Sequence, residues 1–486
     1  MKLKKIFPEK NIPGGIDITG ITDNSKEVKP GYLFIAVPGK SSDGHFFIED
    51  ALKRGAGAVI CNRKTGHIGR GNIIEVESTR EIVWLLGKRY YRDPSTRLKI
   101  TGVTGTNGKT TVSYLIKNIL EAAGIHTGLL GTIDYIIGTR RIPAVLTTPG
   151  TLQLNRFMAQ MVAAGCQACV MEVSSHALEQ GRTRGIAFET AVFTNLGRDH
   201  LDYHKTKDKY LEAKGSLFQG LPADGIAVIN MDDSCAASIR GKTRAGVIGY
   251  GIGENAGGDI LRPKEVEIKG SGMTFIVFGQ GKEIPISTNL LGYHNVYNIL
   301  AAVGVALGYK IPQEAIEKGI AGTGNIPGRL ERISRGQPFE VFIDYAHTAE
   351  ALENVLFTLR GITKGKIILV FGCGGNRDRE KRHLMGKVAD KMADFAIITT
   401  DNPRQEAPEK IAEDIRKGFV NDRYKVIINR KDAVAEAIFT ASRGDIIVIA
   451  GKGHENYQIM KNSVVPFNDR DAVEECLNAF MAGYVS

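Results

Sequence analysis

Residues 99–120, KITGVTGTNGKTTVSYLIKNIL, decide the fold. An apolar, β-rich start is followed by Gly, Thr and Asn, then by Lys-Thr-Thr and a helix-like run. This order predicts a strand, a phosphate-holding loop and a helix, in which Lys109 meets terminal phosphates and Thr110 offers a hydroxyl to Mg²⁺. Val103 breaks the strict G-x-x-x-x-G-K-[ST] spacing. The alternative is a glycine-rich turn with a surface lysine, which the flanking strand and helix disfavour.

The bulk composition indicates a multidomain globular protein. Its 486 residues suggest about three domains, and 43% apolar with 24% charged residues is ordinary for that class. No apolar run approaches the roughly 20 residues of a membrane span, so no stable membrane insertion is expected. The start, MKLKKIFPEKNIPGG, has no apolar segment of an export signal, which predicts a cytoplasmic location. The net charge of +10 comes without a long basic block, which favours anionic metabolites over nucleic acid.

The cysteines do not indicate a disulfide or zinc framework. There are six in the chain, and the C-x-x-C formed by Cys166 and Cys169 has no second pair after it. The surrounding GCQACVMEV is typical of a buried strand. A redox or zinc role is therefore disfavoured.

Three α/β segments follow one another. Residues 1–96 carry short strands between Gly and Pro turns, and RDPSTR reads as a polar link. Residues 97–325 alternate apolar strands with helical stretches, which predicts a mainly parallel sheet. Residues 326–486 repeat that rhythm as a Rossmann-like domain, after a hinge in GTGNIPGRLERI. Polar clusters follow the strands, where open α/β sheets place their ligands.

Two further side chains suit a magnesium nucleotide. Glu172 follows a buried strand, where an unpaired carboxylate would be costly, and His200 lies past the end of another. Taken singly, Glu172 could cap a helix and His200 could be a satisfied core histidine. Their shared placement at the edge of the phosphate loop favours a site.

Longer motifs carry a resemblance to a known family. They are GTNGKTT, LTTP, EVSSHAL, NLGRDHLDYH, YLEAKGSLF, GYHNVYNILAA, PGRLE, DYAHT and GCGGNRDREKR. Their order and spacing over nearly the whole chain resemble the Mur ligases of peptidoglycan synthesis. In that family ATP phosphorylates a substrate carboxylate, and an incoming amine attacks the acyl phosphate. DNPR and GKGHE resemble members that add meso-2,6-diaminopimelate to the D-glutamate of UDP-N-acetylmuramoyl-L-alanyl-D-glutamate.

The resemblance implies a UDP-substrate domain, a central ATP-binding domain and a closing C-terminal domain that also binds the amino acid. Implied UDP-substrate contacts are Ser25, Thr147, Thr148, Ser174, Gln180 and Arg182, with Ser41 and Ser42 in the neighbouring loop. Lys26 stands where the family often has arginine. Implied ATP contacts are Gly105, Thr106, Asn107, Gly108, Lys109, Thr110, Thr111, Asn295, Arg329 and Asp344. LTTP could also be a plain turn, and Arg329 an ordinary hinge ion pair.

Lys214 is the most informative single residue. Its helical context, KYLEAKGSLF, is typical of a solvated lysine. In the family this lysine carries a CO₂-derived carbamate and holds a second Mg²⁺ with the residue matching His200, while Thr110 and Glu172 hold the first. Carbamate formation needs the neutral amine, which at a pKa of about 10.4 is only about one in 2,000 to 3,000 at pH 7. The site must therefore shift that balance.

The amino-acid pocket implied by the family is formed by Arg377, Asp401, Asn402, Pro403, Arg404, Gly451 and Glu455. Diaminopimelate carries one more carboxylate than lysine, and the arginine fork of Arg404 matches it, while Glu455 suits the distal ammonium. The alternative is that Asp-Asn-Pro is a turn and Arg404 a surface residue.

The sequence thus predicts a monomeric ATP-dependent amide ligase. The expected catalytic residues are Lys109, Glu172, His200, Lys214 and Arg329. Related alternatives are a lysine-adding Mur ligase and a folylpolyglutamate synthase-like ligase, which the UDP-site matches and DNPR disfavour. The alternative of a different class is a non-catalytic nucleotide-binding protein.

Overall fold

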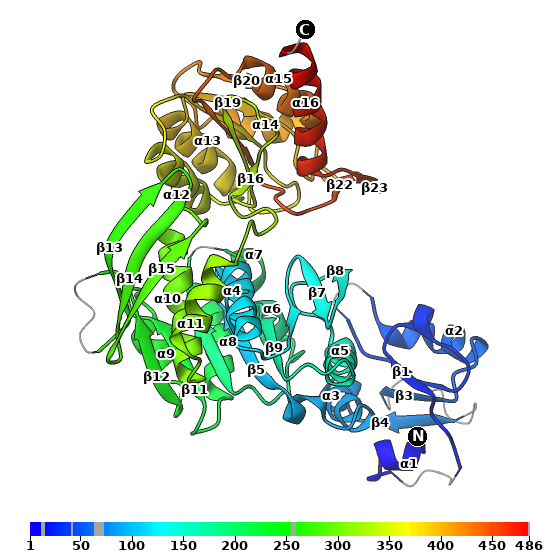
Figure 1. Ribbon diagram of the computed structural model, residues 1–486. Coiled ribbons are helices and arrows are strands. Elements are labelled where there is room, and N and C mark those ends of the chain that lie inside the picture. The colour runs from blue at the N-terminus through cyan, green and yellow to red at the C-terminus, as the bar shows by residue number, and fades with distance from the viewer. Residues whose placement is uncertain (11–14, 40–41, 63–71, 198, 254–258, 485–486) are drawn as a thin grey trace.

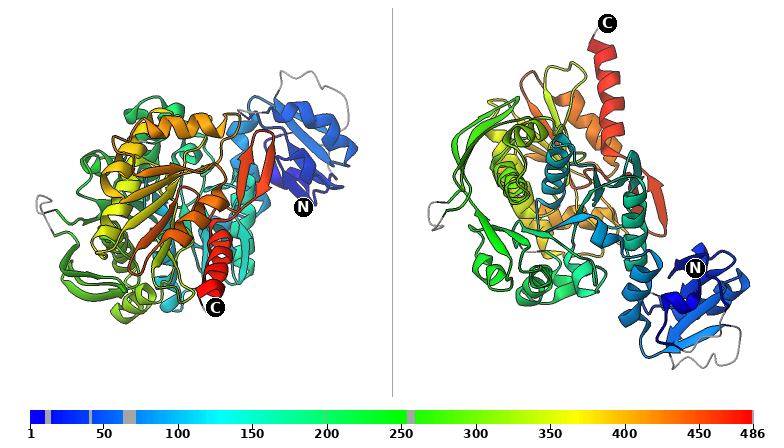
Figure 2. Two further views of the ribbon diagram at one scale, coloured as in Figure 1. Left: turned by 90° about the horizontal axis from the view of Figure 1, so that it is seen from above. Right: turned by 60° about the horizontal axis from the view of Figure 1, so that its bottom comes forward.

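The computed structural model describes residues 1–10, 15–39, 42–62, 72–197, 199–253 and 259–484. Three α/β regions follow one another along the chain, each built around its own main sheet (Figure 1). The N-terminal region lies to one side of the central region, and the C-terminal region covers the central region from above (Figures 1 and 2). The predicted α/β fold with mainly parallel sheets is confirmed.

The N-terminal sheet is entirely parallel, in the order β1-β2-β3-β4. Its strands are β1 (Gly20–Thr22), β2 (Tyr32–Ile35), β3 (Ala58–Asn62) and β4 (Ile73–Val76). The helices are α1 (Leu3–Ile6), α2 (Ile48–Lys53) and α3 (Thr79–Tyr90), with 3₁₀ turns η1 (Ser25–Glu27), η2 (Gly44–Phe47) and η4 (Pro94–Arg97). The predicted polar link RDPSTR contains η4, which leads into the central region. The boundary after residue 96 stays a prediction.

The central sheet has the order β12-β11-β10-β5-β9-β6-β7-β8. Its parallel strands are β5 (Lys99–Thr104), β6 (Thr127–Leu130), β9 (Ala168–Glu172), β10 (Thr190–Phe193), β11 (Ile226–Asn230) and β12 (Gly246–Tyr250). An antiparallel extension is formed by β7 (Asp134–Ile137) and β8 (Arg140–Pro143). Val103 of β5 pairs with Glu172, and Thr104 pairs with Phe193 of β10. The carboxyl ends of β9, β5 and β10 therefore lie together at one edge.

Helices cover both faces of the central sheet, and two apolar clusters fill the space between them and the strands. The helices of this region are α4 (Lys109–Ala122), α5 (Thr151–Ala163), α6 (Ser175–Glu179), α7 (Leu201–His204), α8 (Lys207–Gln219), α9 (Ala236–Arg240), α10 (Tyr293–Gly308) and α11 (Gln313–Ala321). All six cysteines are buried, and Cys169 lies on β9 as the strand interpretation predicts.

A separate antiparallel sheet, absent from the sequence interpretation, follows the central strands. Its strands are β13 (Arg262–Lys269), β14 (Gly272–Gly279) and β15 (Lys282–Thr288). Met273, Phe275 and Val277 alternate along β14 and join the apolar cluster of α4, α10 and α11. The sheet thus buries one face against helices of the central region.

The C-terminal sheet has the order β16-β17-β21-β18-β19-β20 and is parallel except for β16. Its strands are β16 (Glu331–Ile333), β17 (Glu340–Asp344), β18 (Ile367–Phe371), β19 (Phe395–Ile398), β20 (Tyr424–Val426) and β21 (Ile446–Ala450). Its helices are α12 (Ala349–Arg360), α13 (Glu380–Met392), α14 (Pro408–Arg416), α15 (Arg430–Thr440) and α16 (Asp469–Tyr484). A hairpin of β22 (Tyr457–Met460) and β23 (Ser463–Pro466) projects from it. Apolar clusters on both faces support the Rossmann-like prediction.

Candidate active site

The phosphate loop (residues 105–108) joins β5 to α4, as predicted. Gly105 and Gly108 have φ angles of 150° and 86°. A Cβ on Gly105 would lie 1.8 Å from Thr194 Oγ1, and one on Gly108 would lie 2.4 Å from Asn298 Oδ1. Both positions therefore require glycine. Lys109 Nζ donates to the carbonyl oxygen of Gly105 at 2.9 Å, and burial lowers the pKa of this lysine.

The segment that follows β10 holds the loop in place. Asn195 Oδ1 accepts the backbone N–H of Asn107 at 2.9 Å, and Thr194 Oγ1 donates to the Asn107 carbonyl at 2.6 Å. Thr106 Oγ1 accepts the N–H of Gly197 at 3.0 Å. The sequence did not predict Thr194 and Asn195 as site residues, because only the pairing of β10 with β5 places them here.

Glu172 is fully buried at the end of β9, and three donors hold its carboxylate. Thr110 Oγ1 donates to Oε2 at 3.1 Å, Thr132 Oγ1 donates to Oε2 at 2.8 Å, and the Thr132 N–H donates to Oε1 at 2.8 Å. Thr132 follows β6, the strand beside β9, and the sequence interpretation missed it. The predicted oxygen pair of Thr110 and Glu172 is thus brought together.

Lys214 is buried, contrary to the usual expectation for its helical context. It lies on α8 with 1% of its surface exposed, and its Nζ donates to the Gly105 carbonyl at 2.7 Å. The Nζ also lies 4.4 Å from the ring centre of Tyr210. Burial, with a further contribution from Lys109, holds the pKa of Lys214 well below its usual value. The neutral amine is therefore favoured beneath the phosphate loop.

His200 lies in a polar and aromatic setting beside the same loop. Burial lowers the pKa of His200 to about 4, although Asp199, with Oδ2 at 3.5 Å from Nε2, opposes that shift. The ring of His176 is 4.7 Å away, centre to centre. The imidazole is neutral at neutral pH and can offer a nitrogen lone pair to a metal ion.

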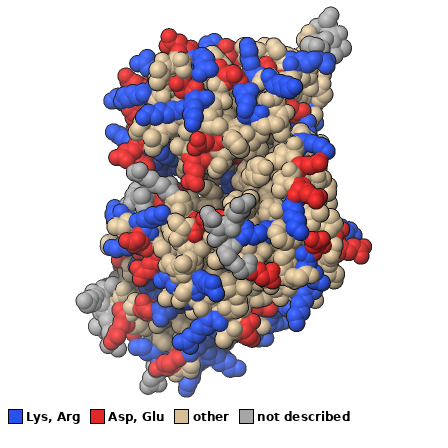
Figure 3. Space-filling model, turned by 90° about the vertical axis from the view of Figure 1, so that its left-hand side faces the viewer, with Lys and Arg blue, Asp and Glu red and all other residues tan. Residues whose placement is uncertain are grey.

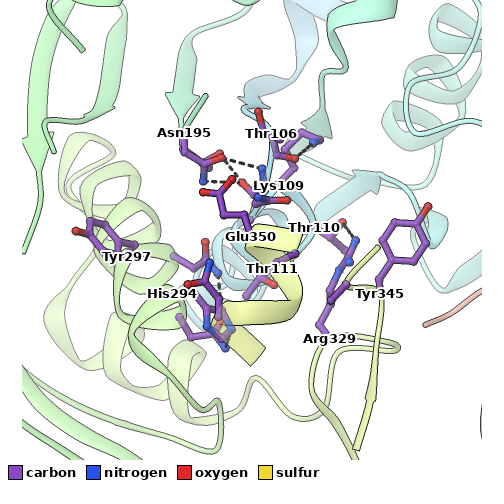
Figure 4. Close-up of a pocket in the computed structure, with 18 of the residues that line it drawn as sticks. Thr106, Lys109, Thr110, Thr111, Asn195, His294, Tyr297, Arg329, Tyr345 and Glu350 are labelled. Carbon is purple, nitrogen blue, oxygen red and sulfur yellow. Dashed lines mark hydrogen bonds between the residues drawn. The ribbon is translucent and has the colours of Figure 1, made fainter. Parts of the chain in front are cut away.

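One cavity of about 490 Å³ joins the phosphate loop to α10 and to the C-terminal region. Asn295 enters it from α10, and Arg329 and Asp344 enter it from the C-terminal region. Arg329 Nη2 donates to Thr110 Oγ1 at 3.3 Å, as Figure 4 shows. Asp344 Oδ2 accepts the N–H of Leu330 at 2.7 Å, which fixes the segment that carries Arg329.

Thr111, which the sequence predicted, also lines the cavity. Several residues that the sequence interpretation missed line it as well. Figure 4 shows His294, Tyr297, Tyr345 and Glu350 among them. The guanidinium of Arg329 lies 4.7 Å from the ring centre of Tyr345. The adjacency of His294 to Asn295 and of Tyr345 to Asp344 was the signal available for two of these residues.

Four of the predicted UDP-substrate residues form one hydrogen-bonded group, here called the peptide network: Thr148, Ser174, Gln180 and Arg182. Thr148 Oγ1 donates to the Glu172 carbonyl at 2.8 Å and accepts the Ser174 N–H at 3.0 Å. Arg182 donates to the Thr148 carbonyl at 3.0 Å and to Gln180 Oε1 at 2.6 Å. The network therefore lies directly against the backbone of Glu172.

The other predicted UDP-substrate residues lie at the rim of this network or in the N-terminal region. Thr147 Oγ1 lies 3.1 Å from Thr132 Oγ1 and can donate to it, because the Thr132 hydroxyl proton is given to Glu172. Ser25 is buried at the start of η1, and Glu27 of that turn lies 3.5 Å from Arg156 on α5. Ser42 is exposed, and Ser41 lies outside the described residues.

The predicted amino-acid contacts lie on three loops, here called the amino-acid loops: residues 372–379 after β18, 399–407 after β19, and 451–456 after β21. Asn402 Nδ2 donates to Glu455 Oε2 at 2.8 Å. Arg404 Nη1 donates to the Gly375 carbonyl at 2.9 Å. The buried Lys452, which the sequence interpretation missed, donates to Glu455 Oε2 at 2.9 Å.

Close backbone approach joins these loops. Gly451 has a φ of 109°, and a Cβ there would lie 2.8 Å from Asp401 Oδ2. A Cβ on Gly375 would lie 1.9 Å from the Pro403 carbonyl oxygen, and one on Gly374 would lie 3.8 Å from Arg377 Cγ. The structure thus brings all seven predicted amino-acid residues to one edge of the C-terminal sheet.

Thr110 and Glu172 fit a magnesium ion, because a hydroxyl and a carboxylate are hard oxygen donors that face a phosphate loop. Within the part of the chain that the structure describes, no group of three or more His, Cys, Asp and Glu side chains is arranged to hold a metal.

Surface charge and helix length bear on other functions. Lys and Arg are interspersed with Asp and Glu over the face in Figure 3, so the net positive charge does not gather there. Among the described residues, none of the helices combines the length and apolar character needed to cross a membrane.

Three family models match successive parts of the chain. They are the Mur ligase family, catalytic domain, at residues 17–90; the Mur ligase middle domain at 103–306; and the Mur ligase, glutamate ligase domain at 328–453. The chain belongs to the Mur ligase family.

Relatives along the full length carry a more particular name. The UDP-N-acetylmuramoyl-L-alanyl-D-glutamate--2,6-diaminopimelate ligase of Aquifex aeolicus is 44% identical over 95% of this chain and 94% of its own length. The ligase of the same name from Solibacter usitatus is 42% identical over 96% of this chain and 94% of its own. A solved structure of a ligase of that name is 33% identical, with a TM-score of 0.68 over 99% of both chains.

Proposed function

We propose that the protein adds meso-2,6-diaminopimelate to the D-glutamate of UDP-N-acetylmuramoyl-L-alanyl-D-glutamate, with ATP, in peptidoglycan precursor synthesis. The substrate carboxylate attacks the γ-phosphorus of ATP, and ADP leaves. The amine then attacks the acyl carbon, loses a proton and expels phosphate. The cytoplasmic location and the monomeric state stay predictions.

Glu172 carries this proposal, because it joins two sites. Its carboxylate accepts from Thr110 in the phosphate cavity, at 3.1 Å. Its backbone carbonyl accepts from Thr148 of the peptide network, at 2.8 Å. An acceptor carboxylate in that network would therefore lie beside the phosphates, which is the arrangement that phosphoryl transfer to a carboxylate requires.

The ATP phosphates would bind to the backbone amides of the phosphate loop. Lys109 would contact them from the start of α4, and Arg329 would contact them from the C-terminal region. Both cations offset charge on the transferring group. Arg329 reaches Thr110 only because the C-terminal region covers the cavity. That cover also excludes water, which would otherwise hydrolyse the acyl phosphate.

Thr110 and Glu172 would hold one Mg²⁺, and His200 with carbamylated Lys214 a second, each supplying positive charge to the phosphates. The neutral Nζ of Lys214 attacks the carbon of CO₂, forms an N–C bond and releases one proton. The burial of Lys214 supports this step, because it favours the neutral amine.

The amino-acid loops would present diaminopimelate to the acyl phosphate. Arg404 is half-buried and held by the Gly375 carbonyl, so its remaining donors can pair with the distal carboxylate. Glu455, held by Asn402, would accept a hydrogen bond from the distal ammonium. Lysine lacks the carboxylate that Arg404 would pair with.

The test is the mass of the product formed from the UDP-dipeptide, Mg-ATP and one amino acid at a time. We expect an adduct with meso-diaminopimelate, formed together with ADP and phosphate. ADP release without an adduct would contradict the ligase assignment, and no ADP release would favour the non-catalytic alternative. Equal use of L-lysine would contradict only the choice of amino acid.

A further inference from the structure

We propose that Arg430 and Asp469 form a positioning pair, which fixes two of the amino-acid loops relative to each other and so contributes to the choice of amino acid. The inference rests on the proposed function and names a determinant of the same site. Neither residue belongs to the predicted pocket. They act through the backbone that carries Asp401 to Arg404 and Gly451 to Glu455.

The pair is fully buried where the first turns of α15 and α16 meet. Arg430 Nε donates to Asp469 Oδ1 at 2.7 Å, and Nη2 donates to Oδ2 at 2.8 Å. Neither side chain has any exposed surface. This is the bidentate geometry in which a guanidinium and a carboxylate hold each other in a fixed orientation.

The same guanidinium also contacts both loops. Arg430 Nη2 donates to the carbonyl of Ala450 at 2.9 Å, and Nη1 lies 3.5 Å from the carbonyl of Thr400. Ala450 directly precedes Gly451, and Thr400 directly precedes Asp401. Arg430 therefore sits at the base of two loops, where each leaves the sheet.

The order of the strands shows why a side-chain link between the bases of the two loops matters. β19 and β21, which lead into these loops, are not neighbours, because β18 lies between them. Strands two places apart are about 10 Å from each other and share no backbone hydrogen bonds. β18 sets the spacing of the two strands, and beyond the strand ends side-chain contacts add to the backbone in setting the distance between the two loops.

A second tie joins the same loops at their tips. Asn402 Nδ2 donates to Glu455 Oε2 at 2.8 Å, and Lys452, which lies in the same loop as Glu455, fixes that oxygen with a hydrogen bond of 2.9 Å. Loops held at both base and tip would present Arg404 and Glu455 at a fixed separation. A ligand with a distal carboxylate and a distal ammonium can pair with Arg404 and Glu455 at once only if these two side chains are held at a fixed distance.

Stability alone does not account for the pair. Taking two charges out of water costs several kcal/mol per ion, and apolar residues of similar volume are often as stabilising. Burial lowers the pKa of Arg430, but the carboxylate of Asp469, with smaller contributions from Asp401 and Glu455, holds that pKa above its usual value. The guanidinium therefore stays charged and keeps its hydrogen bonds to the two loops.

The experiment compares the wild type with Arg430→Lys and Asp469→Asn in the full-length chain. KM and kcat are measured for meso-diaminopimelate and L-lysine, and KM for the UDP-dipeptide and ATP, together with Tm. Lysine keeps the charge but cannot form the fork. We expect kcat/KM for diaminopimelate to fall by about 10²-fold through KM, the size of effect that a 1 Å misplacement produces. KM for the UDP-dipeptide and ATP should stay unchanged, and the preference over lysine should shrink.

Lys431→Ala and Glu475→Ala are the matched controls. These residues form an exposed ion pair of 2.7 Å between the same two helices, and we expect them to leave all constants unchanged. A lower Tm with an unchanged preference for diaminopimelate would overturn the inference, as would an equal rise of all KM values. Failure of both Arg430→Lys and Asp469→Asn to fold would also overturn it, because the pair would then serve the fold. The proposed function fails separately, if the wild type forms no diaminopimelate product.

Discussion

The phosphate loop and the amino-acid loops both lie at the carboxyl ends of parallel strands, but they are held in different ways. The phosphate loop is a single short segment between β5 and α4. The segment after β10 hydrogen-bonds to it, and Glu172 of β9 holds Thr110 at its end. The amino-acid loops are three separate segments. The buried Arg430 contacts the bases of two of them across an intervening strand, and Asn402 and Glu455 join the same two. A contiguous segment fixes the first site, whereas distant side chains fix the second.

This difference predicts different responses to mutation. Residues of the phosphate site should affect turnover with little effect on the fold, because the strands and α4 hold the backbone independently of them. Residues of the amino-acid loops should affect specificity and local stability together, since the same charges hold the loops and face the ligand.

Lys214→Ala tests the phosphate site most strongly. Without the proposed carbamate, the proposed second metal ion would lose a ligand, and we expect kcat to fall by about 10³-fold or more, as when electrostatic stabilisation of a transition state is removed. Far-UV circular dichroism should stay like that of the wild type. Small carboxylates added in solution should restore part of the activity. Wild-type activity in Lys214→Ala would contradict the carbamate and leave the ligase assignment standing.

Arg404→Ala tests the amino-acid loops. Sites built around polar partners can reject analogues that lack them by on the order of 10⁴-fold, so the wild type should prefer diaminopimelate strongly over lysine. Loss of the arginine should lower kcat/KM for diaminopimelate by about 10²- to 10³-fold, as for truncation of a buried charge pair. Lysine use should change little. The measurement is kcat/KM for both amino acids, and an unchanged ratio in the variant would show that Arg404 is not the determinant.

Arg329→Ala addresses the contact between the two regions. Arg329 reaches Thr110 from the C-terminal region, so its loss should lower kcat by about 10²-fold, the usual effect of removing one charge-stabilising donor. Binding of the UDP-dipeptide, measured by calorimetry without ATP, should be unchanged, because the peptide network lies in the central region. If the affinity for the UDP-dipeptide fell as much as kcat, Arg329 would belong to the UDP-substrate site and not to the ATP site.

The sequence predicted the local parts of both sites. The strand, loop and helix around Lys109 are adjacent in the chain, and Glu172 directly ends an apolar strand, so pattern and position were enough. The three amino-acid loops were likewise expected where polar clusters follow strands. Each of these features depends on a few consecutive residues.

Other features depend on which strands become neighbours, and no local pattern shows that. Thr132 reaches Glu172 only because β6 lies beside β9. The helical pattern around Lys214 indicates a solvated residue, and its burial follows from where α8 packs. Arg430 and Asp469 are 39 positions apart and pair only once α15 and α16 meet. The antiparallel strands β13 to β15 were missed because the chain was interpreted as βα units alone.

Glu406→Gln should have the smallest effect, and it should appear in stability. Glu406 follows Arg404 by two residues, and its carboxylate accepts from the buried Arg382 at 2.9 and 3.0 Å and from the Asn376 N–H at 2.5 Å, which joins two amino-acid loops. The hydrogen bonds from Arg382 lower the pKa of Glu406 from 4.5 to about 2, against the opposing effect of burial. The folded state thus binds this proton less readily than the unfolded state. The resulting stability is fully present above pH 4.5 and is lost as the pH falls to about 2.

In Glu406→Gln, Tm at pH 7 should fall by about 2 to 4 °C, the shift produced by about 1 kcal/mol in a domain of this size. The difference from the wild type should shrink below pH 4.5. Glu436→Gln, which breaks the exposed pair with Lys425, is the control and should leave Tm unchanged. A Tm difference that does not vary with pH would show that the Glu406 carboxylate does not hold these loops through its charge.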